Sequence, residues 1–545
     1  MVPQGWRVWG HRAGPVVLGL VLGALALGPG LRRGFVLRYD MVFVPSPPWS
    51  MSALGLAEGA PRGFPSDAVV TALASVLPAD LVQKAILLGI FVLGAAGAAR
   101  LLPEAPLVAR LAAGAVYVWN PYVAERLLIG QWALLLGYAG LPWAVRAVAE
   151  IGRGRGGFGR RSGGGGVWGD AWRVGVALVP GAVGGFAPMT VVAPVVVGVA
   201  LARRTGRVRA VGIAAGAWVV LALPWAVPGV LARVTTDPAG VDVFAARADT
   251  PFGAAGSLLA LGGVWNREVV PSGYGRGAVA WVWLAFVVLG IVAYGVAAWR
   301  GRGSGAGWMW GLGAGAVAGY GIAVFGVTGV GRGVLRGLVG AVPAFGVVRD
   351  GQRFVAPVAL VAAVGIGLAA RWVVRACARR EAAGSGVLAA GVAVVAPVML
   401  LPTLAYGAAG RIEAVWYPPD WLRARAVMAA DPAPGAVLVL PWTAYRGFAW
   451  NGGRTVLDPA TAFFGRRVIW NDGLRVDGRA LAPEDPAARA VDAALARPGP
   501  GVGVRVRYVV VEGGKNENVF QVRLAGFRRV YRGTDISVYR LVTSR

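Results

Sequence analysis

The chain has 545 residues, of which 57% are hydrophobic and only 15% are charged. Soluble globular proteins are about 25% charged, so this composition predicts that most of the chain dissolves in lipid. Cys377 is the single cysteine and His11 the single histidine. These counts exclude disulfides within the chain, Cys/His zinc sites and catalytic centres of the Ser-His-Asp or Cys-His kind.

The formal net charge of +28 would ordinarily suggest a nucleic-acid partner, because clustered basic residues neutralise phosphates. Lys84 and Lys515 are the only lysines, so the basic residues are almost all arginines, and many stand at the ends of apolar runs. Arginine at such positions fixes the topology of a membrane protein and meets anionic lipid head groups. We therefore expect membrane lipid, and no nucleic acid, as a partner.

The first apolar run, residues 14–30, follows Arg7 and Arg12, and no small-residue cleavage site comes after it. We interpret this run as a signal anchor. Further charge-poor runs then follow along the chain, and together they predict an all-α polytopic membrane domain of about eleven transmembrane helices over residues 1–410. These further runs lie near residues 85–102, 107–123, 127–145, 174–186, 188–202, 210–232, 278–299, 304–328, 354–374 and 385–409.

The stretch 174–202 is the most ambiguous of these runs. Its interruptions by Gly and Pro are compatible with one long helix or with a tight hairpin. Arginines stand at both ends of the stretch, so the positive-inside rule favours two cytosolic ends and hence a hairpin.

The same rule divides the loops between two compartments. The predicted cytosolic parts are the N-terminus, segment 152–166 and the loops around Arg203, Arg300 and Arg379. The predicted outer parts are loops 31–83, 233–277 and 329–353 and everything after Arg411. Acidic residues support this division, because inner loops hold few of them whereas the outer loops hold Asp40, Glu58, Asp67, Asp80, Asp237, Asp242, Asp249, Glu268 and Asp350.

Residues 411–545 have an ordinary charge density and short β-rich runs. The runs 437–441 (VLVLP), 507–511 (RYVVV) and 536–541 (ISVYRL) predict strands, and 486–497 predicts a helix. We therefore expect a small extracytoplasmic α/β domain behind the last span. Its aromatic residues would suit carbohydrate stacking as well as a core; they include Trp442, Tyr445, Trp450 and Trp470.

Asp40 is the first candidate functional residue, because it follows Tyr39 where the first helix leaves the membrane. Partial desolvation at this boundary would raise the pKa of the carboxyl group toward that of a useful general base. The alternative is an exposed loop acid paired with Arg38 or Arg33.

Two further segments place polar residues at the predicted outer ends of helices. In segment 118–132, Glu125, Arg126 and Gln131 would project into or near one outer cavity. The alternative for this segment is an interfacial belt of Trp and Tyr with an ion pair that caps a helix. In 349–353 (RDGQR), two arginines beside an acid could hold a phosphate, because guanidinium binds phosphate through paired hydrogen bonds. Flanking charge that only fixes topology is the alternative for this second segment.

Together, the segments 38–45 (RYDMVFVP), 120–143 (NPYVAERLLIGQWALLLGYAGLPW) and 347–357 (VVRDGQRFVAP), with the C-terminal domain, resemble the GT-C superfamily of polytopic glycosyltransferases. The resemblance implies transfer of a sugar from a polyprenyl-phosphate donor to an envelope glycan or glycoprotein at the outer membrane face. It implies Asp40 as the catalytic base and, in some members, Mg²⁺ or Mn²⁺. Many members carry two adjacent acids in the first loop, whereas Asp40 has no acidic neighbour. The substrate-binding residues implied are Glu125, Arg126, Gln131, Asp350 and Gln352, with Arg349 or Arg353 on the donor phosphate.

Two other functions are compatible with the sequence. A transporter or flippase of lipid-linked precursors would surround a site at mid-membrane with broken helices. A non-enzymatic envelope assembly protein would bind its partner through the exported domain.

Overall fold

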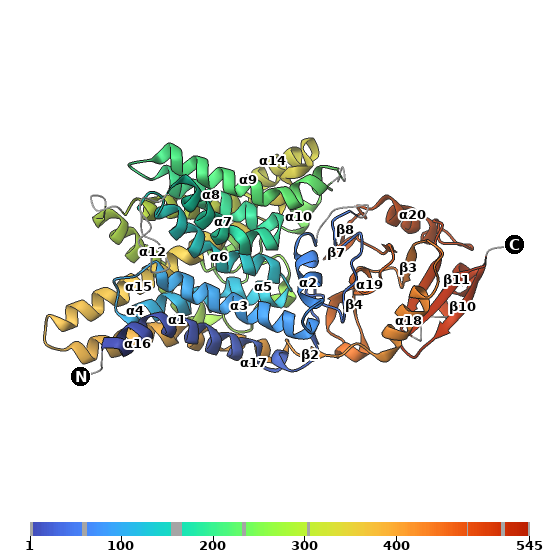
Figure 1. Cartoon of the computed structure of the whole chain (residues 1–545), viewed down its shortest axis with the longest axis horizontal. Helices are drawn as coiled ribbons and strands as arrows, with labels where there is room; N and C mark the ends of the chain where they lie inside the picture. Colours follow the sequence, from blue (N-terminus) through green and yellow to red (C-terminus); the bar gives the residue numbers. More distant parts are fainter. Residues whose placement is uncertain are drawn as a thin grey trace.

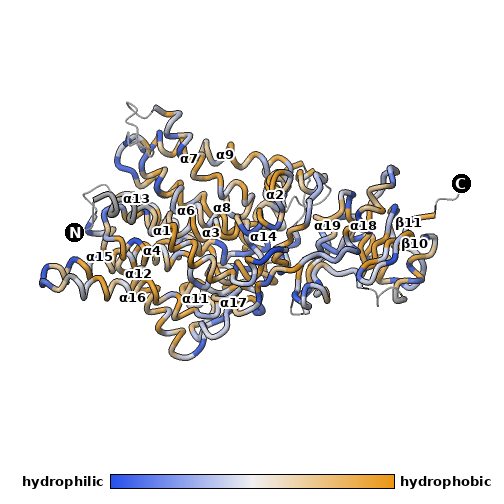
Figure 2. The backbone as a smooth tube through the Cα atoms, turned by 60° about the horizontal axis from the view of Figure 1, so that its bottom comes forward, coloured by the Kyte–Doolittle hydropathy of each residue, from blue (hydrophilic) through white to orange (hydrophobic). Residues whose placement is uncertain are grey.

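The computed structural model describes residues 4–56, 63–153, 166–231, 236–301, 306–476, 478–513 and 518–542. Glu58 and most of segment 152–166 lie outside the described residues. Helices form an elongated bundle, and a unit that contains most of the strands lies at one end of it (Figure 1). Figure 2 shows hydrophobic stretches along the helices of this bundle and hydrophilic residues at several helix ends.

Seven helices of the described chain are long and apolar enough to cross a membrane, which is compatible with a multi-pass membrane protein. An eighth span results if Gly384–Leu400 and Pro402–Gly410, which are bent by 65°, count as one. The seven are Ala13–Leu31, which includes most of α1 (Gln4–Leu27), α3 (Ala79–Arg100), α6 (Trp132–Ala149), α9 (Arg207–Leu231), α12 (Gly277–Arg300), α13 (Gly307–Phe325) and Gly351–Ala378, which includes α15 (Ala356–Ala378). The bent pair comprises α16 (Ala383–Leu400) and α17 (Ala405–Gly410).

The predicted count of eleven spans is therefore not confirmed. The runs 107–123, 174–186 and 188–202 do not meet the same criteria of length and hydropathy. The first run is broken because Asn120 accepts a hydrogen bond from the Val123 amide (3.0 Å) and Pro121 starts a new helix, the usual composition of a helix N-terminus. These runs form α4 (Leu107–Val118), α5 (Pro121–Leu128), α7 (Val167–Gly184) and α8 (Phe186–Leu201).

Helices α7 and α8 form the hairpin that the arginine pattern favours. Near the start of α7, Asp170 accepts a hydrogen bond from the Gly152 amide (3.1 Å). Just beyond the end of α8, Arg203 donates to the Ala149 carbonyl (2.8 Å). Both contacts are made at the C-terminal end of α6, so the chain turns back between them. The turn is at Gly185, whose φ of +82° suits glycine.

The loops that were predicted to share a compartment lie at the same end of the bundle. Arg411 donates to the Val270 carbonyl (3.3 Å), and Arg349 lies 3.7 Å from Glu484 of the C-terminal unit. The first loop pairs there too, through β1 (Phe35–Val36) and β2 (Ala414–Val415). At the opposite end, Arg146 donates to the Arg100 carbonyl (3.0 Å). The three predicted outer loops therefore lie at the end that carries the C-terminal unit.

A five-stranded sheet forms the centre of this unit, in the order β10-β11-β9-β3-β6. Strand β3 pairs in parallel with both β6 and β9. Strand β11 pairs antiparallel with β9 on one side and with β10 on the other. The predicted strands and helix in this region are confirmed. Their bounds are β3 (Val437–Leu440), β6 (Val468–Ile469), β9 (Tyr508–Glu512), β10 (Phe527–Arg532), β11 (Ile536–Leu541) and α20 (Pro486–Leu495).

The remaining helices and strands are short. The two small ladders of the C-terminal unit are β4 (Tyr445–Gly447) with β5 (Thr455–Leu457) and β7 (Leu474–Val476) with β8 (Arg479–Leu481). The other α-helices are α2 (Ser66–Ala74), α10 (Gly240–Val243), α11 (Gly253–Leu259), α14 (Gly329–Ala341), α18 (Pro419–Ala429) and α19 (Ala460–Phe463).

The bundle and the C-terminal unit share one continuous apolar core. The cluster of buried side chains extends from Leu22 in α1 through Phe35 and Tyr417 to Val538 in the sheet. Trp450 packs on Tyr417 and Phe448 within it. Trp450 is therefore part of the core, as one of the two interpretations of the aromatic residues predicted. The C-terminal unit contacts the bundle through apolar side chains as well as through paired strands.

Candidate functional site

Asp40 lies where the first outer loop meets the C-terminal unit. Its side chain is exposed, and its Oδ1 accepts a hydrogen bond from the Tyr445 hydroxyl (2.5 Å). The preceding residue, Tyr39, bonds through its main chain to Thr455 and Leu457 (2.8 and 2.9 Å). The loop is thus held on the edge of β5, and Tyr445 fixes the orientation of the Asp40 carboxylate.

The arginines near Asp40 have other partners as well. Arg33 donates to Asp80 (2.5 Å), and Arg38 donates to the Leu128 carbonyl (3.1 Å). Asp40 is exposed, as the alternative of a loop acid predicted, and the ion pair that Arg33 makes is with Asp80.

The turn between α5 and α6 contacts the first outer loop. The Asp40 amide donates to the Ile129 carbonyl (3.1 Å). Gly130 follows, with a φ of +82°, and a Cβ atom there would lie 2.2 Å from the Met41 nitrogen and 2.5 Å from the Arg38 carbonyl oxygen. Only glycine fits between the turn and the loop.

We expect Gly130→Ala to lower the stability of the protein by about 1–3 kcal/mol, because a left-handed residue and a backbone clash must both be accommodated. Thermal unfolding of the purified chain in detergent measures this. Gly89→Ala is the matched control, since nothing lies within 4 Å of its Cβ position in α3. That variant should be neutral or slightly stabilising, and equal midpoints for both variants would contradict the packing described.

Glu125 and Arg126 are buried rather than lining an open outer cavity, which corrects the prediction for them. Each is 1% exposed, and their charged groups are 3.9 Å apart. The Arg126 guanidinium also lies over the Tyr122 ring. The alternative of an interfacial aromatic belt is wrong for this segment, because Trp119, Tyr122 and Trp132 are buried too.

The Glu125 carboxyl group interacts with that of Asp249, a residue of the second outer loop. Burial, and secondly Asp249, raise the pKa of Glu125 well above its usual value. Sequence reasoning placed Asp249 in an outer loop but not in this pair, because the loop has no periodic pattern that would indicate its partner.

Several buried polar atoms around this pair have no hydrogen-bond partner within the described chain. Such atoms cost about 1–3 kcal/mol each, so in native proteins they generally have a functional explanation. They are therefore candidates for contact with a polar ligand. Apart from the two carboxyl groups, they include Gln131 Oε1, Asp350 Oδ1 and both amide atoms of Gln352.

Segment 349–353 packs against α5, since the Tyr122 hydroxyl donates to the Arg353 carbonyl (3.0 Å). Its arginines, however, both face carboxylates. Arg353 contacts Asp350, and Arg349 lies 3.7 Å from Glu484 and over the Phe244 ring. The predicted phosphate contact of Arg349 or Arg353 would have to compete with these acids.

Arg38 and Arg411 are a different kind of pair. Arg38 donates to the Leu128 carbonyl, and Arg411 to the carbonyls of Val270 and Glu268. Burial lowers the pKa of both guanidinium groups, and the charge of Arg411 lowers that of Arg38 further. The carboxylate of Glu268, which the Tyr39 hydroxyl binds, also attracts both arginines. Two partly buried positive charges that bond to main-chain carbonyls thus lie near Tyr39, the residue before Asp40.

Strained backbone adjoins both arginines. Tyr39, beside Arg38, has a φ of +44°. Before Arg411, the non-glycine residues Tyr406, Ala408 and Ala409 have φ between +49° and +58°. Each such residue costs roughly 1–2 kcal/mol, and backbone strain of this kind clusters at functional sites.

The candidate site offers few side-chain oxygen ligands for a resident Mg²⁺ or Mn²⁺. Among the described residues, no three His, Cys, Asp or Glu side chains are grouped to hold a metal ion. Glu125 and Asp249 supply two carboxyl groups, and Mg²⁺ is usually bound through one or two carboxylates together with substrate phosphates.

Comparison with known proteins gives no family model that matches this chain and no matching curated relative.

Proposed function

We propose that the chain is an integral membrane glycosyltransferase of the GT-C type. It would transfer a sugar from a polyprenyl-phosphate donor to an envelope glycan or glycoprotein. The reaction would take place at the outer face of the cytoplasmic membrane, with the N-terminus in the cytosol and residues 411–545 outside as a domain.

Eleven passes are part of this proposal. What supports the additional three is that α4, α7 and α8 each lead from one end of the bundle to the other. Gly14, near the start of the span Ala13–Leu31, adjoins Leu107 at the start of α4, and beyond the end of α4 Trp119 donates to the Leu401 carbonyl (3.0 Å). The tip of the α7–α8 hairpin, Gly185, adjoins Phe64 of the first outer loop. An odd number of passes puts the two termini on opposite faces.

The observation that carries the proposal is the position of Asp40. Its exposed carboxylate is oriented by Tyr445, and the preceding residue, Tyr39, interacts with two positive charges, those of Arg38 and Arg411. A general base beside an anion-binding pair is what sugar transfer from a phosphate donor requires.

In the proposed reaction, the acceptor hydroxyl attacks the anomeric carbon of the sugar and Asp40 takes its proton. The bond between the anomeric carbon and the phosphate oxygen breaks, and the polyprenyl phosphate leaves with the bonding electrons. Arg38 and Arg411 would stabilise the negative charge that develops on the phosphate. Direct displacement inverts the anomeric configuration.

The distribution of buried charge favours a reaction at one face over passage through the middle of the bundle. Buried charged residues of the described chain lie near helix ends, as do Asp80 and Asp350 at the end with the C-terminal unit and Asp170 at the other. A transporter places its polar site near the bilayer midplane.

The direct test uses the purified full chain in lipid vesicles, with radiolabelled polyprenyl-phosphate-linked hexose or pentose and an oligosaccharide acceptor. We expect label in the water-soluble acceptor with inverted anomeric configuration. Intact labelled donor that only changes leaflet would instead identify a flippase. No movement of label with either sugar class would contradict both functions.

Arg411→Ala should raise the KM for the donor roughly 10- to 100-fold, because a hydrogen bond between charged groups contributes about 1.5–3 kcal/mol. Arg411→Lys should lie between this variant and the natural protein, since it keeps the charge but loses the paired geometry. Arg267→Ala, at an exposed position nearby, is the control. An unchanged donor KM, or an equal rise in the acceptor KM, would remove Arg411 from the phosphate site.

A further inference from the structure

Helix α14 lies between the spans α13 and α15, at the end of the bundle that carries the candidate site. It has 13 residues. The helix packs on α10 of the second outer loop, and Arg349, which follows it, lies 3.7 Å from Glu484 of the C-terminal unit. Both ends of α14 therefore lie at the same end of the bundle, and the chain enters the next membrane helix without crossing in between.

One side of α14 is already packed. Leu335 and Val339 are buried against Val241 of α10. Arg336 and Arg332 lie 2.6 and 3.6 Å from the Asp242 carboxylate of the same helix. These contacts fix the rotation of α14 about its own axis.

The neighbouring side of α14 is apolar and exposed. Val330, Val334 and Leu338 are 78%, 47% and 39% exposed. A spacing of four residues places them on one face of the helix. These three side chains form a hydrophobic stripe, which we call the α14 stripe. Val342 and Phe345, which follow the helix, are also exposed.

A lipid surface is the partner that fits this arrangement. The segments before and after α14 are membrane spans, so the helix begins and ends near the level where lipid head groups meet water. A short helix with an aliphatic face and arginines beside it is typical of helices that lie in this interface. Arg336 is partly exposed and can reach the head groups from there.

We propose that α14 is an in-plane interfacial helix, with the α14 stripe seated between the head groups and the acyl chains of the leaflet on the side of the C-terminal unit. This goes beyond the proposed function and does not depend on it. It makes α14 a membrane anchor for the outer loop that also carries Arg349, Asp350 and Arg353.

The single cysteine makes the test direct, because Cys377→Ser gives a cysteine-free background. Val334→Cys is labelled with an environment-sensitive fluorophore, and the full chain is placed in nanodiscs of phosphatidylcholine and phosphatidylglycerol. We expect emission at shorter wavelength than in water, and quenching by lipids that carry a nitroxide near the top of the acyl chain. Leu338→Cys should behave in the same way, and it keeps the test valid if one variant folds poorly.

Gly333→Cys is the matched control on the same helix. It neighbours Val334 in sequence but lies about 100° around the helix, and nothing lies within 4 Å of its Cβ position. Its label should emit as in water and resist quenching. Equal emission and equal quenching at positions 333, 334 and 338 would overturn the proposal. So would a shift at 334 that resists lipid nitroxides and grows with protein concentration, since that result would identify a second copy of the chain as the partner.

Discussion

Asp40→Asn is expected to lower the rate of sugar transfer by about 10²- to 10⁴-fold, the usual contribution of a general base. Asparagine has nearly the same size as aspartate, and its carbonyl oxygen can still accept the hydrogen bond that Tyr445 donates. The docking of the first outer loop should therefore survive. What the variant loses is the capacity to take the proton of the acceptor hydroxyl. The measurement is the turnover of labelled donor in vesicles at saturating acceptor.

Two companion variants separate chemistry from positioning. Tyr445→Phe removes the hydroxyl that orients Asp40, so we expect a smaller loss of turnover with the same dependence on pH. Asp237→Asn changes an outer-loop acid that bonds to an amide of its own loop, and it should leave turnover unaltered. If Asp40→Asn retains full turnover, Asp40 is not the base. If the Asp40→Asn variant loses thermal stability along with turnover, the role of Asp40 is to dock the first outer loop.

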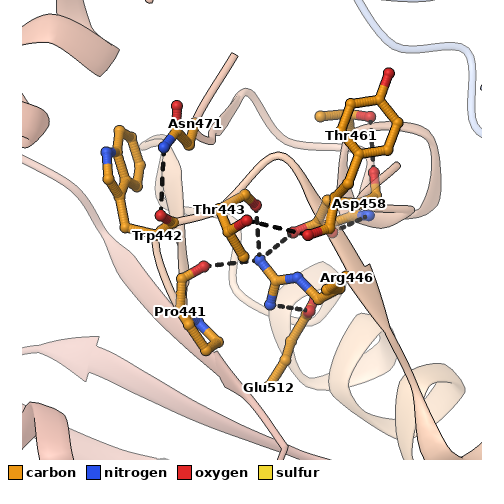
Figure 3. Close-up of polar contacts among 10 residues, drawn as sticks. Pro441, Trp442, Thr443, Arg446, Asp458, Thr461, Asn471 and Glu512 are labelled. Carbon is orange, nitrogen blue, oxygen red and sulfur yellow. Dashed lines mark hydrogen bonds and ion pairs between the residues drawn. The ribbon is translucent and has the colours of Figure 1, made fainter. Parts of the chain in front are cut away.

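Arg446→Met is expected to destabilise the C-terminal unit by about 3–5 kcal/mol, the usual cost of removing one partner from a buried group of charges. Arg446 lies between Asp458 and Glu512, at 2.8 and 2.6 Å, and both acids are 1% exposed (Figure 3). It also donates to the Pro441 and Thr443 carbonyls. Without it, two buried carboxyl groups face each other and lose the cation between them.

Denaturant unfolding of the full chain in detergent, followed by tryptophan fluorescence, measures this effect. Arg423→Met is the matched control, because its side chain is 69% exposed and 3.7 Å from Asp420. Exposed pairs of that kind contribute at most about 1 kcal/mol. Equal losses for the two variants would show that the Arg446 cluster is not an essential part of the core.

The same cluster gives a dependence on pH. Burial, and secondly Asp458, raise the pKa of Glu512 well above its usual value. Above the pKa of a free glutamate, the folded chain therefore keeps a proton that the unfolded chain has released. Stability should fall as pH rises through the interval between the two pKa values. Glu512→Gln should reduce this slope, and an unchanged slope would assign it to other groups.

Much of the fold follows from local patterns in the sequence. Apolar runs bounded by arginine predicted the seven helices that are long enough to span a membrane. Arginines at both ends of 174–202 predicted the hairpin, and β-rich runs predicted three strands and one helix of the C-terminal unit. These features depend on residues close together in the chain, so periodicity and charge suffice. The count of eleven spans is not confirmed, because three of the apolar runs form helices that fall short of the length or hydropathy of a span, one of them because Asn120 and Pro121 start a new helix inside it.

The candidate site could be predicted only in part. Polar residues at helix ends indicated Asp40, Glu125 and Gln352, and the structure brings their segments to one end of the bundle. The pairing of Glu125 with Asp249, and that of Asp40 with Tyr445, joins residues far apart in irregular loops. No local pattern encodes such pairs, because they depend on how the loops pack. The arginines at 349 and 353 suggested a phosphate contact, but their partners are Asp350 of the same segment and Glu484, which the sequence could not place beside them.

The ladder that holds Tyr39 and Asp40 also sets an order of events during synthesis. Asp40 emerges early, yet its partner Tyr445 follows 405 residues later. At about 5–20 residues per second, the first loop must wait on the order of tens of seconds after translocation before its final neighbours exist. Until then its strand edge is open to wrong pairing. A ribosome that stalls before β4, or a chain truncated there, would leave a bundle whose first outer loop has no partner strand, so a segment made late in synthesis decides when the candidate site is complete.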